Sequence, residues 1–116
     1  MAVDWDAIQK ASTQLENNMK NAHNEINELT FSGSSEDERI KATMKGSFAL
    51  EELAISANAI DTSQTPEHIA QYLNTQSTIA INDAVNQIRE YSKAKIAKLA
   101  GDFDTKLADK ADQKDD

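Results

Sequence analysis

The stretch TPEHIAQYLNTQSTIAINDAVNQIREYSKAKIAKLAG, residues 65–101, decides the fold because it has the pattern of one very long helix. Thr65 is a favourable N-cap, Pro66 fits the first helical position, and Glu67 suits the positive end of the helix dipole. Gly101 is the expected stop, which predicts about 35 helical residues, or ~52 Å. A compact chain of 116 residues has a radius of gyration of only ~13 Å. The helix must therefore project, kink or pack along a second chain.

Upstream of this helix, the segment RIKATMK (residues 39–45) alternates between apolar and polar side chains. Ile40, Ala42 and Met44 face one way, and the intervening polar residues face the other. This period of two predicts a half-buried β-strand. The following Lys45, Gly46 and Ser47 are typical of a hairpin turn.

The segments on either side of this strand are less clear. FALEELAIS (residues 48–56) is rich in Ala, Leu and Glu, which favour a helix by propensity. As a strand, it would need a β-bulge near Glu51 and Glu52 to keep its apolar residues on one face. Before the strand, Ser32–Ser35 and the acidic Glu36–Glu38 predict a turn or loop.

The N-terminal segment predicts a first long helix from Asp4 or Asp6 to Leu29. Asp6 and Gln9 resemble a capping box at its start. An apolar stripe at steps of three and four runs along it, made of Trp5, Ile8, Ala11, Leu15, Met19, Ala22, Ile26 and Leu29. The stripe fits either packing on the chain's own core or contact with a partner helix.

Composition limits the possible classes of protein. The net charge is −8, hydrophobic residues make up 39% and aromatic residues 5%, which is lean for a globule and normal for a helix-rich, partly exposed chain. The absence of cysteine excludes disulfides and thiolate metal sites. No window approaches ~18 consecutive apolar residues and the N-terminus lacks a signal-peptide pattern, so we expect a cytoplasmic protein with no membrane partner.

The cations are not spread evenly along this acidic chain. Residues 67–100 carry a net charge of +1, whereas residues 1–30, 31–66 and 101–116 each carry −3. On a helical projection, Asn82, Asn86, Arg89 and Lys93 fall together beside the apolar sector, Lys95 lies on its other flank, and Lys98 lies further round. Arg and Lys suit phosphate oxygens, and Asn suits phosphate or a base edge. The same pattern also fits an ordinary solvated helix face.

The order of these segments resembles the YbaB/EbfC family of small bacterial nucleoid-associated proteins. The resemblance covers about residues 5–100 and includes an amphipathic first helix, a strand ending in Gly33, an alternating strand with the Lys45–Gly46 turn, and Leu50–Ile55 leading into Ile60–Asp61. The clearest match is Ala80–Val85 (AINDAV), which is similar to the family's "AVNDAL"-type segment, followed by Ser92–Lys93. The chain departs from the family in its acidic SSEDE after Gly33 and in its longer SANA before Ile60.

The resemblance implies an α+β fold, with an α-β-β-β-α protomer in which two long helices flank a small antiparallel sheet. It favours a strand for residues 50–55 and implies an intertwined homodimer with helices projecting like tweezers. Residues 1–100 would form this domain, and residues 101–116 an acidic, disordered tail. The acidic loop after Gly33 argues against DNA contact at that point.

The implied function is binding of duplex DNA in the bacterial nucleoid, through the helices and with little sequence specificity. The expected contact residues are Asn82, Asn86, Arg89, Lys93, Lys95 and Lys98, assisted by Lys10 and Lys20. We expect no catalysis, because neither His23 nor His68 has a neighbouring nucleophile at a triad spacing, and no metal, cofactor or small-molecule substrate. The alternative is an acidic protein-interaction adaptor or secretion-linked chaperone that does not bind DNA.

Overall fold

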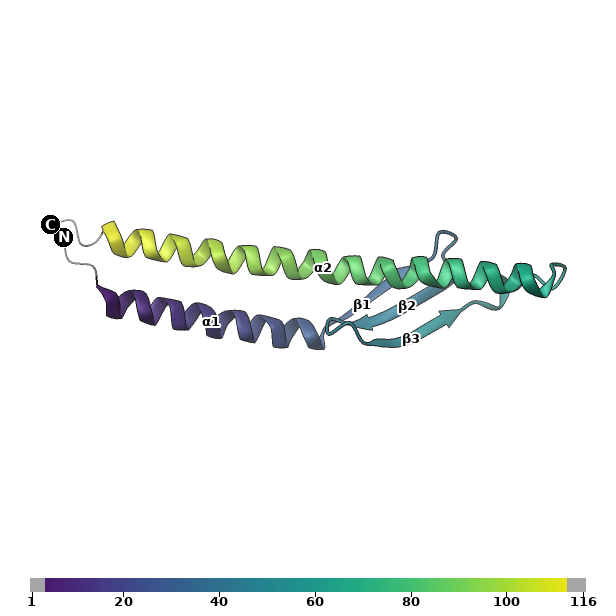
Figure 1. Cartoon of the computed structure of the whole chain (residues 1–116), viewed down its shortest axis with the longest axis horizontal. Coiled ribbons are helices and arrows are strands. Elements are labelled where there is room, and N and C mark those ends of the chain that lie inside the picture. Colours follow the sequence, from purple (N-terminus) through teal and green to yellow (C-terminus); the bar gives the residue numbers. More distant parts are fainter. Residues whose placement is uncertain (1–3, 113–116) are drawn as a thin grey trace. The chain divides into compact units, whose positions relative to one another are not determined.

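The computed structural model describes the backbone of residues 4–112 and the side chains of residues 4–102. Its elements follow in the order α1 (Trp5–Glu28), β1 (Thr30–Ser34), β2 (Ile40–Lys45), β3 (Leu50–Ile55), a short 3-10 helix η1 (Ala57–Ala59) and α2 (Pro66–Asp112). This α-β-β-β-α order confirms the predicted α+β fold (Figure 1). The chain divides into a sheet unit, residues 26–91, and a helical unit formed by residues 1–25 and 92–116.

The sheet unit is built on three antiparallel strands in the order β1-β2-β3. Residues 50–55 form a strand, as the family resemblance implies and against their helical propensity. The register between β2 and β3 shifts beside Glu51, because Thr43 pairs with Glu52 whereas the adjacent Met44 pairs with Leu50. The predicted β-bulge is therefore confirmed, and it keeps the leucines of β3 on one face of the sheet.

The central strand β2 provides the apolar face of the sheet. Ile40, Ala42 and Met44 are buried, while the residues between them are exposed or half-buried, which confirms the predicted alternation. These three side chains pack with a buried row on α2, which consists of Ala80, Ala84 and Ile88. The part of α2 that belongs to this unit accordingly lies along one face of the sheet (Figure 1).

Helix α2 approaches β1 so closely that a side chain would not fit between them. A Cβ atom built on Gly33 would lie 2.1 Å from the carbonyl oxygen of Ala80 and 2.4 Å from the backbone nitrogen of Ala84. Because both obstacles are backbone atoms of a helix, they cannot move aside independently. Glycine in β1 and alanine at two positions one turn apart on α2 together set the distance between helix and sheet.

Side chains of α2 also bind the outer edge of β1. The Ser34 backbone N–H donates to the Asp83 carboxylate at 3.0 Å, and the Gln87 amide donates to the Ser32 carbonyl at 2.8 Å. Just beyond the strand, the Glu36 N–H donates to the Gln76 side-chain oxygen at 3.2 Å. Residues 32–34, predicted as loop from composition, are therefore part of β1, because α2 supplies hydrogen bonds that an edge strand otherwise obtains from water.

The turn between β2 and β3 packs on the end of α1. The Gly46 N–H donates to the Leu29 carbonyl at 2.9 Å, and a Cβ on Gly46 would lie 1.8 Å from the Ile26 carbonyl oxygen. The turn is closed by the Phe48 N–H, which donates to the Lys45 carbonyl at 2.9 Å. Phe48 itself has a φ of 66°, a left-handed conformation that is unusual for a bulky residue.

Of the two starts predicted for α1, Asp4 is the one observed, and the start predicted for α2 is confirmed. The N-cap of α1 is Asp4, whose carboxylate accepts from the Ala7 N–H at 3.1 Å, and not Asp6. The N-cap of α2 is Thr65, as predicted, because its hydroxyl accepts from the His68 N–H at 3.2 Å.

At its other end, α2 continues through Gly101, where we expected it to stop, to Asp112. Gly101 does not end the helix because an α-helix tolerates a glycine at a cost of only about 1 kcal/mol relative to alanine. The predicted disordered tail extends into residues outside the described part of the chain and stays a prediction. No helix in the described residues is long and apolar enough to cross a membrane.

Replacement of Gly33 by Ala tests the close helix–sheet contact. We expect Gly33→Ala to lower the free energy of unfolding by about 1–3 kcal/mol, because the new methyl group overlaps helix backbone. Urea unfolding followed by circular dichroism measures the change. Gly101→Ala is the matched control, since its Cβ would meet nothing within 4 Å. That variant should gain up to about 1 kcal/mol, and an equal effect of both variants would contradict the close approach at Gly33.

The acidic loop after β1 is tied down by its own side chains. The Asp37 carboxylate accepts hydrogen bonds from the Tyr72 hydroxyl on α2, from the Ser35 hydroxyl at 2.8 Å and from the Arg39 N–H at 3.2 Å. The bond from Tyr72, followed by that from Ser35, lowers the pKa of Asp37 from 3.8 to about 2. Asp37 therefore joins the loop to the first turns of α2 as long as it is ionised.

This arrangement predicts an acid-sensitive contribution to stability. Because the pKa of Asp37 is depressed in the folded state, its contribution is complete above about pH 4 and is lost as the pH falls towards 2. We expect Tyr72→Phe to raise the pKa of Asp37, and hence to reduce the stability that the protein loses between pH 5 and pH 2.5. An NMR titration of the Asp37 carboxyl group measures the pKa directly. Tyr91→Phe is the control, and an unchanged Asp37 pKa in Tyr72→Phe would refute the assignment.

Candidate nucleic-acid interface

The predicted contact residues on α2 begin in the sheet unit. Asn82, Asn86 and Arg89 are all exposed, whereas Ala80, Ala84 and Ile88 are buried against the sheet. With 100° between successive helical residues, the three polar side chains centre about half a turn away from the buried row. The sheet unit therefore presents them to solvent, on the side of the helix away from the strands.

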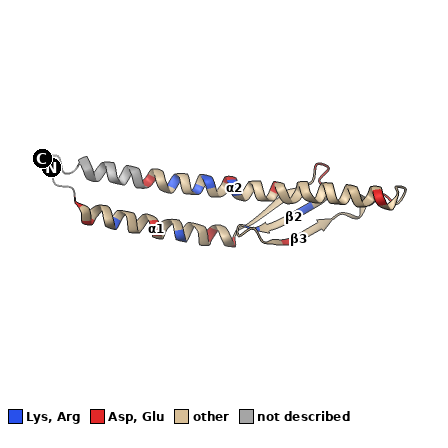
Figure 2. Ribbon diagram, viewed as in Figure 1, with Lys and Arg blue, Asp and Glu red and all other residues tan. Residues whose placement is uncertain are grey.

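The remaining α2 candidates belong to the helical unit, and they do not share one face. Lys93 is exposed and follows Arg89 by four residues in the sequence. Lys98 is also exposed and lies five residues after Lys93, so these two lysines point about 140° apart around the helix. We use the name α2 ridge for Asn82, Asn86 and Arg89 of the sheet unit together with Lys93 of the helical unit, the four residues that the helical projection of the sequence groups. Figure 2 shows the run of Lys and Arg along this helix.

Among the cations of α2 whose side chains are described, Lys95 is the one with an ion-pair partner. Its ammonium lies 3.9 Å from the carboxylate of Glu25 on α1, and its side chain is 37% exposed. Other basic residues are also compensated, since Lys45 lies 3.9 Å from both Glu28 and Glu51. Among the described side chains, Arg89, Lys93 and Lys98 form no ion pair within 4.0 Å. Their charge is therefore available to an external anion.

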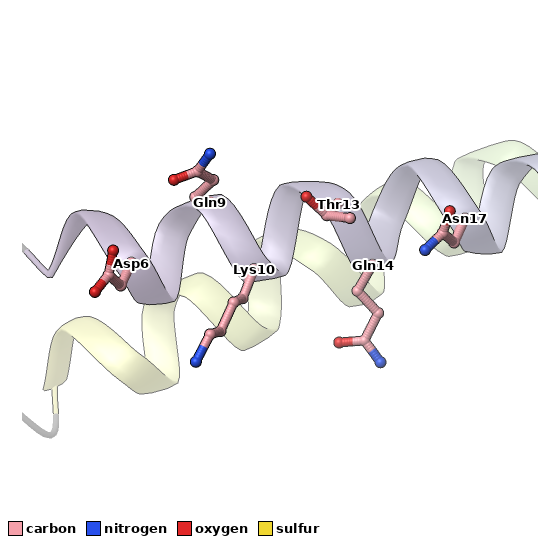
Figure 3. Close-up of a pocket in the computed structure, with 6 residues that line it drawn as sticks. All are labelled: Asp6, Gln9, Lys10, Thr13, Gln14 and Asn17. Carbon is pink, nitrogen blue, oxygen red and sulfur yellow. The ribbon is translucent and has the colours of Figure 1, made fainter.

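The two candidates on α1, Lys10 and Lys20, are exposed as well. Lys10 lines a shallow groove of about 460 Å³ whose other lining residues are Asp6, Gln9, Thr13, Gln14 and Asn17 (Figure 3). All of these residues come from α1, and in Figure 3 the Lys10 and Gln14 side chains extend to the same side of the helix. The groove offers amide and hydroxyl groups and is lined by one cation and one carboxylate, so it has no excess of positive charge.

Most residues of the AINDAV segment (80–85) pack against or bind the sheet, and only one belongs to the α2 ridge. Ala80 and Ala84 allow the close approach to Gly33, and Asp83 binds the edge of β1. Only Asn82 of this segment is exposed and without a part in these contacts. The sequence of this segment does not show that its alanines pack on the sheet or that Asp83 binds the edge of β1, because Asp83 is as polar as its exposed neighbours. Two alanines one turn apart, read together with the glycine of β1, are the signal from which the helix–sheet contact is predictable.

No catalytic or metal site emerges in the described part of the chain. His23 and His68 are both exposed, and no three His, Asp or Glu residues between positions 4 and 102 are placed to hold a metal ion. A small crevice of about 190 Å³ lies among residues that include Arg39, Asp61, His68 and Tyr72. Two of its charged side chains form hydrogen bonds with nearby backbone groups. Arg39 donates to the Asn58 carbonyl at 3.2 Å, and Asp61 accepts from the Ser63 N–H at 3.0 Å.

Comparison with known proteins places the chain in a family. Residues 1–103 match the YbaB/EbfC DNA-binding family. A nucleoid-associated protein of Streptococcus equi subsp. zooepidemicus is 31% identical over 81% of this chain and 90% of its own length. Nucleoid-associated proteins of Lactococcus lactis subsp. cremoris, at 28% identity over 84% of this chain and 93% of theirs, and of Buchnera aphidicola, at 25% over 83% of both chains, are also similar. The chain belongs to the YbaB/EbfC DNA-binding family.

Proposed function

We propose that this protein is a nucleoid-associated protein of the bacterial cytoplasm that binds the backbone of duplex DNA as a homodimer, with little sequence preference. The observation that carries the proposal is the α2 ridge, whose cations and amides are all exposed, in a chain of a DNA-binding family. The names of the similar proteins, each a nucleoid-associated protein, support the same function.

The chemistry of the ridge suits phosphate rather than bases. Arg89 offers a planar fork of N–H donors to phosphate oxygens, and Lys93 offers a compact charge. Contacts of this kind fix a protein on DNA but carry no sequence information. The net charge of −8 does not prevent them, because cellular salt screens surface charges beyond about 8 Å. A ridge with two cations should bind weakly and with strong dependence on salt concentration.

A second copy of the chain would double this site. With Arg89 and Lys93 from each protomer, the dimer would present four ridge cations, and Lys95 and Lys98 would bring the candidate cations on its α2 helices to eight. Each phosphate that the dimer neutralises would release counterions from the DNA, so every added contact would steepen the salt dependence. The homodimer would thus bind DNA more tightly than a single chain, because it offers twice as many cations to the phosphates.

The place where a second copy would dock is the open side of β3. Leu50 and Ile55 pair with Met44 and Ile40 across the sheet, so their side chains lie on the face that α2 covers over β1 and β2. Yet Leu50 is 46% and Ile55 42% exposed, and the neighbouring Phe48 is 51% exposed. The outer backbone edge of β3 has no neighbouring strand among residues 4–112. Apolar side chains beside an unpaired edge are typical of an interface.

DNA binding is tested by fluorescence anisotropy of a labelled duplex titrated with protein from low to physiological salt. We expect affinity to fall steeply with salt, and Arg89→Ala/Lys93→Ala to weaken binding and flatten the salt slope. A dimer would lose about four phosphate contacts, each worth roughly 0.9 in the slope of log K against log salt.

The matched control for the ridge compares single variants of equal charge. Lys93→Ala and Lys41→Ala each remove one exposed lysine, but Lys41 lies on β2 and outside the ridge. Equal weakening by both variants would contradict the ridge as the contact surface. If the wild-type protein fails to bind DNA even at low salt, the alternative of an acidic protein-interaction adaptor or secretion-linked chaperone takes its place.

The homodimer is tested by light scattering coupled to size-exclusion chromatography. We expect a mass of two chains for the wild type, and dissociation to single chains for Leu50→Asp, because a carboxylate would be buried without a partner at the interface. Glu52→Gln, an exposed change on the opposite face of β3, is the control and should leave the dimer intact. A wild-type protein of one-chain mass would refute the proposed dimer.

A further inference from the structure

The ion pair between Lys95 and Glu25 lies within the helical unit, where it joins the two helices. Its nitrogen and oxygen are 3.9 Å apart, and both side chains are accessible, Lys95 being 37% and Glu25 69% exposed. Of the cations predicted to contact DNA, Lys95 is the one that has an ion-pair partner among the described residues. A phosphate approaching Lys95 therefore meets a carboxylate that already occupies the place of a counterion.

We propose that Glu25 is an internal competitor of DNA phosphate for Lys95, and so sets the affinity and salt dependence of DNA binding. This inference rests on the proposed function. The carboxylate and a phosphate diester present the same kind of anionic oxygen to the ammonium. A phosphate that binds Lys95 either displaces Glu25 and breaks the ion pair, or binds beside Glu25 and is repelled by its negative charge. In both cases the affinity for DNA is lower than it would be without Glu25.

The exposed position of the pair determines the size of the effect. Exposed ion pairs contribute little to stability because water solvates both partners, so DNA can break this one without unfolding the protein. The competitor is therefore weak and reversible. When it is removed, we expect the affinity for DNA to rise about two- to fivefold, in line with the small free energies of exposed pairs.

Removal of the competitor should also change the salt slope. In the wild type, Lys95 releases few counterions from DNA because Glu25 partly neutralises it. Once Glu25 is replaced, Lys95 becomes a full phosphate contact, and the slope of log K against log salt should steepen by up to about 0.9 for each protomer. Removal of any acidic residue makes the protein less negative and can raise its affinity for DNA in general. That general effect does not depend on Lys95, whereas the effect proposed for Glu25 does.

The experiment measures DNA-binding anisotropy for Glu25→Gln, which removes the charge but retains the shape and length of the side chain. Glu16→Gln is the matched control, because Glu16 is an exposed glutamate of α1 that forms no ion pair among the described residues. We expect Glu25→Gln to gain two- to fivefold in affinity and Glu16→Gln clearly less. Thermal unfolding of both variants checks that the fold is unchanged.

A double-mutant cycle isolates the pair itself. In a Lys95→Ala background, Glu25→Gln should have no more effect than Glu16→Gln, because the contested ammonium is absent. If Glu25→Gln and Glu16→Gln give the same gain in the wild-type background, or if the gain persists in Lys95→Ala, the inference is wrong while the proposed function stands. If neither the wild type nor Glu25→Gln binds DNA at low salt, the proposed function fails and this inference fails with it.

Discussion

The contact between Gly33 of β1 and the turn of α2 that contains Ala80 and Ala84 is the constraint on which the sheet unit depends. It brings helix backbone against strand backbone, where a single methyl group would not fit. At that distance Asp83 and Gln87 reach the edge of β1, and the buried row of α2 reaches the apolar side chains of β2. Loss of the close approach would disturb the hydrogen bonds and the core together.

The same contact fixes which side of α2 remains available for a ligand. One side of the helix packs on the sheet and its adjoining flank binds the edge of β1, so only the side away from the strands stays in water. Asn82, Asn86 and Arg89 lie there. The residues that build the fold and those proposed to bind DNA thus alternate along a single helix.

The sequence predicts α1, β2 and the start of α2 well because each has a local signal, namely the apolar stripe of α1, the alternation of residues 40–44 and the Thr65 cap. It predicts β3 less well, since LEELAI has helical propensity, and only pairing with β2 makes it a strand. The hydrogen bonds from Asp83 and Gln87 to β1 and the Lys95–Glu25 pair are not predictable from local pattern, because their partners lie 49, 55 and 70 residues apart along the chain. Gly101 is a misleading signal for the end of α2, because glycine weakens a helix without necessarily ending it.

The hydrogen bonds from α2 to the edge of β1 have a consequence for how many chains can assemble. A sheet with two free edges can add chains at both sides and grow into a fibre. Here Asp83 and Gln87 occupy one edge, so within the described part of the chain β3 is the edge at which another strand can be added. Two chains that meet through β3 use up the free edge of each, so edge-to-edge growth stops at a pair.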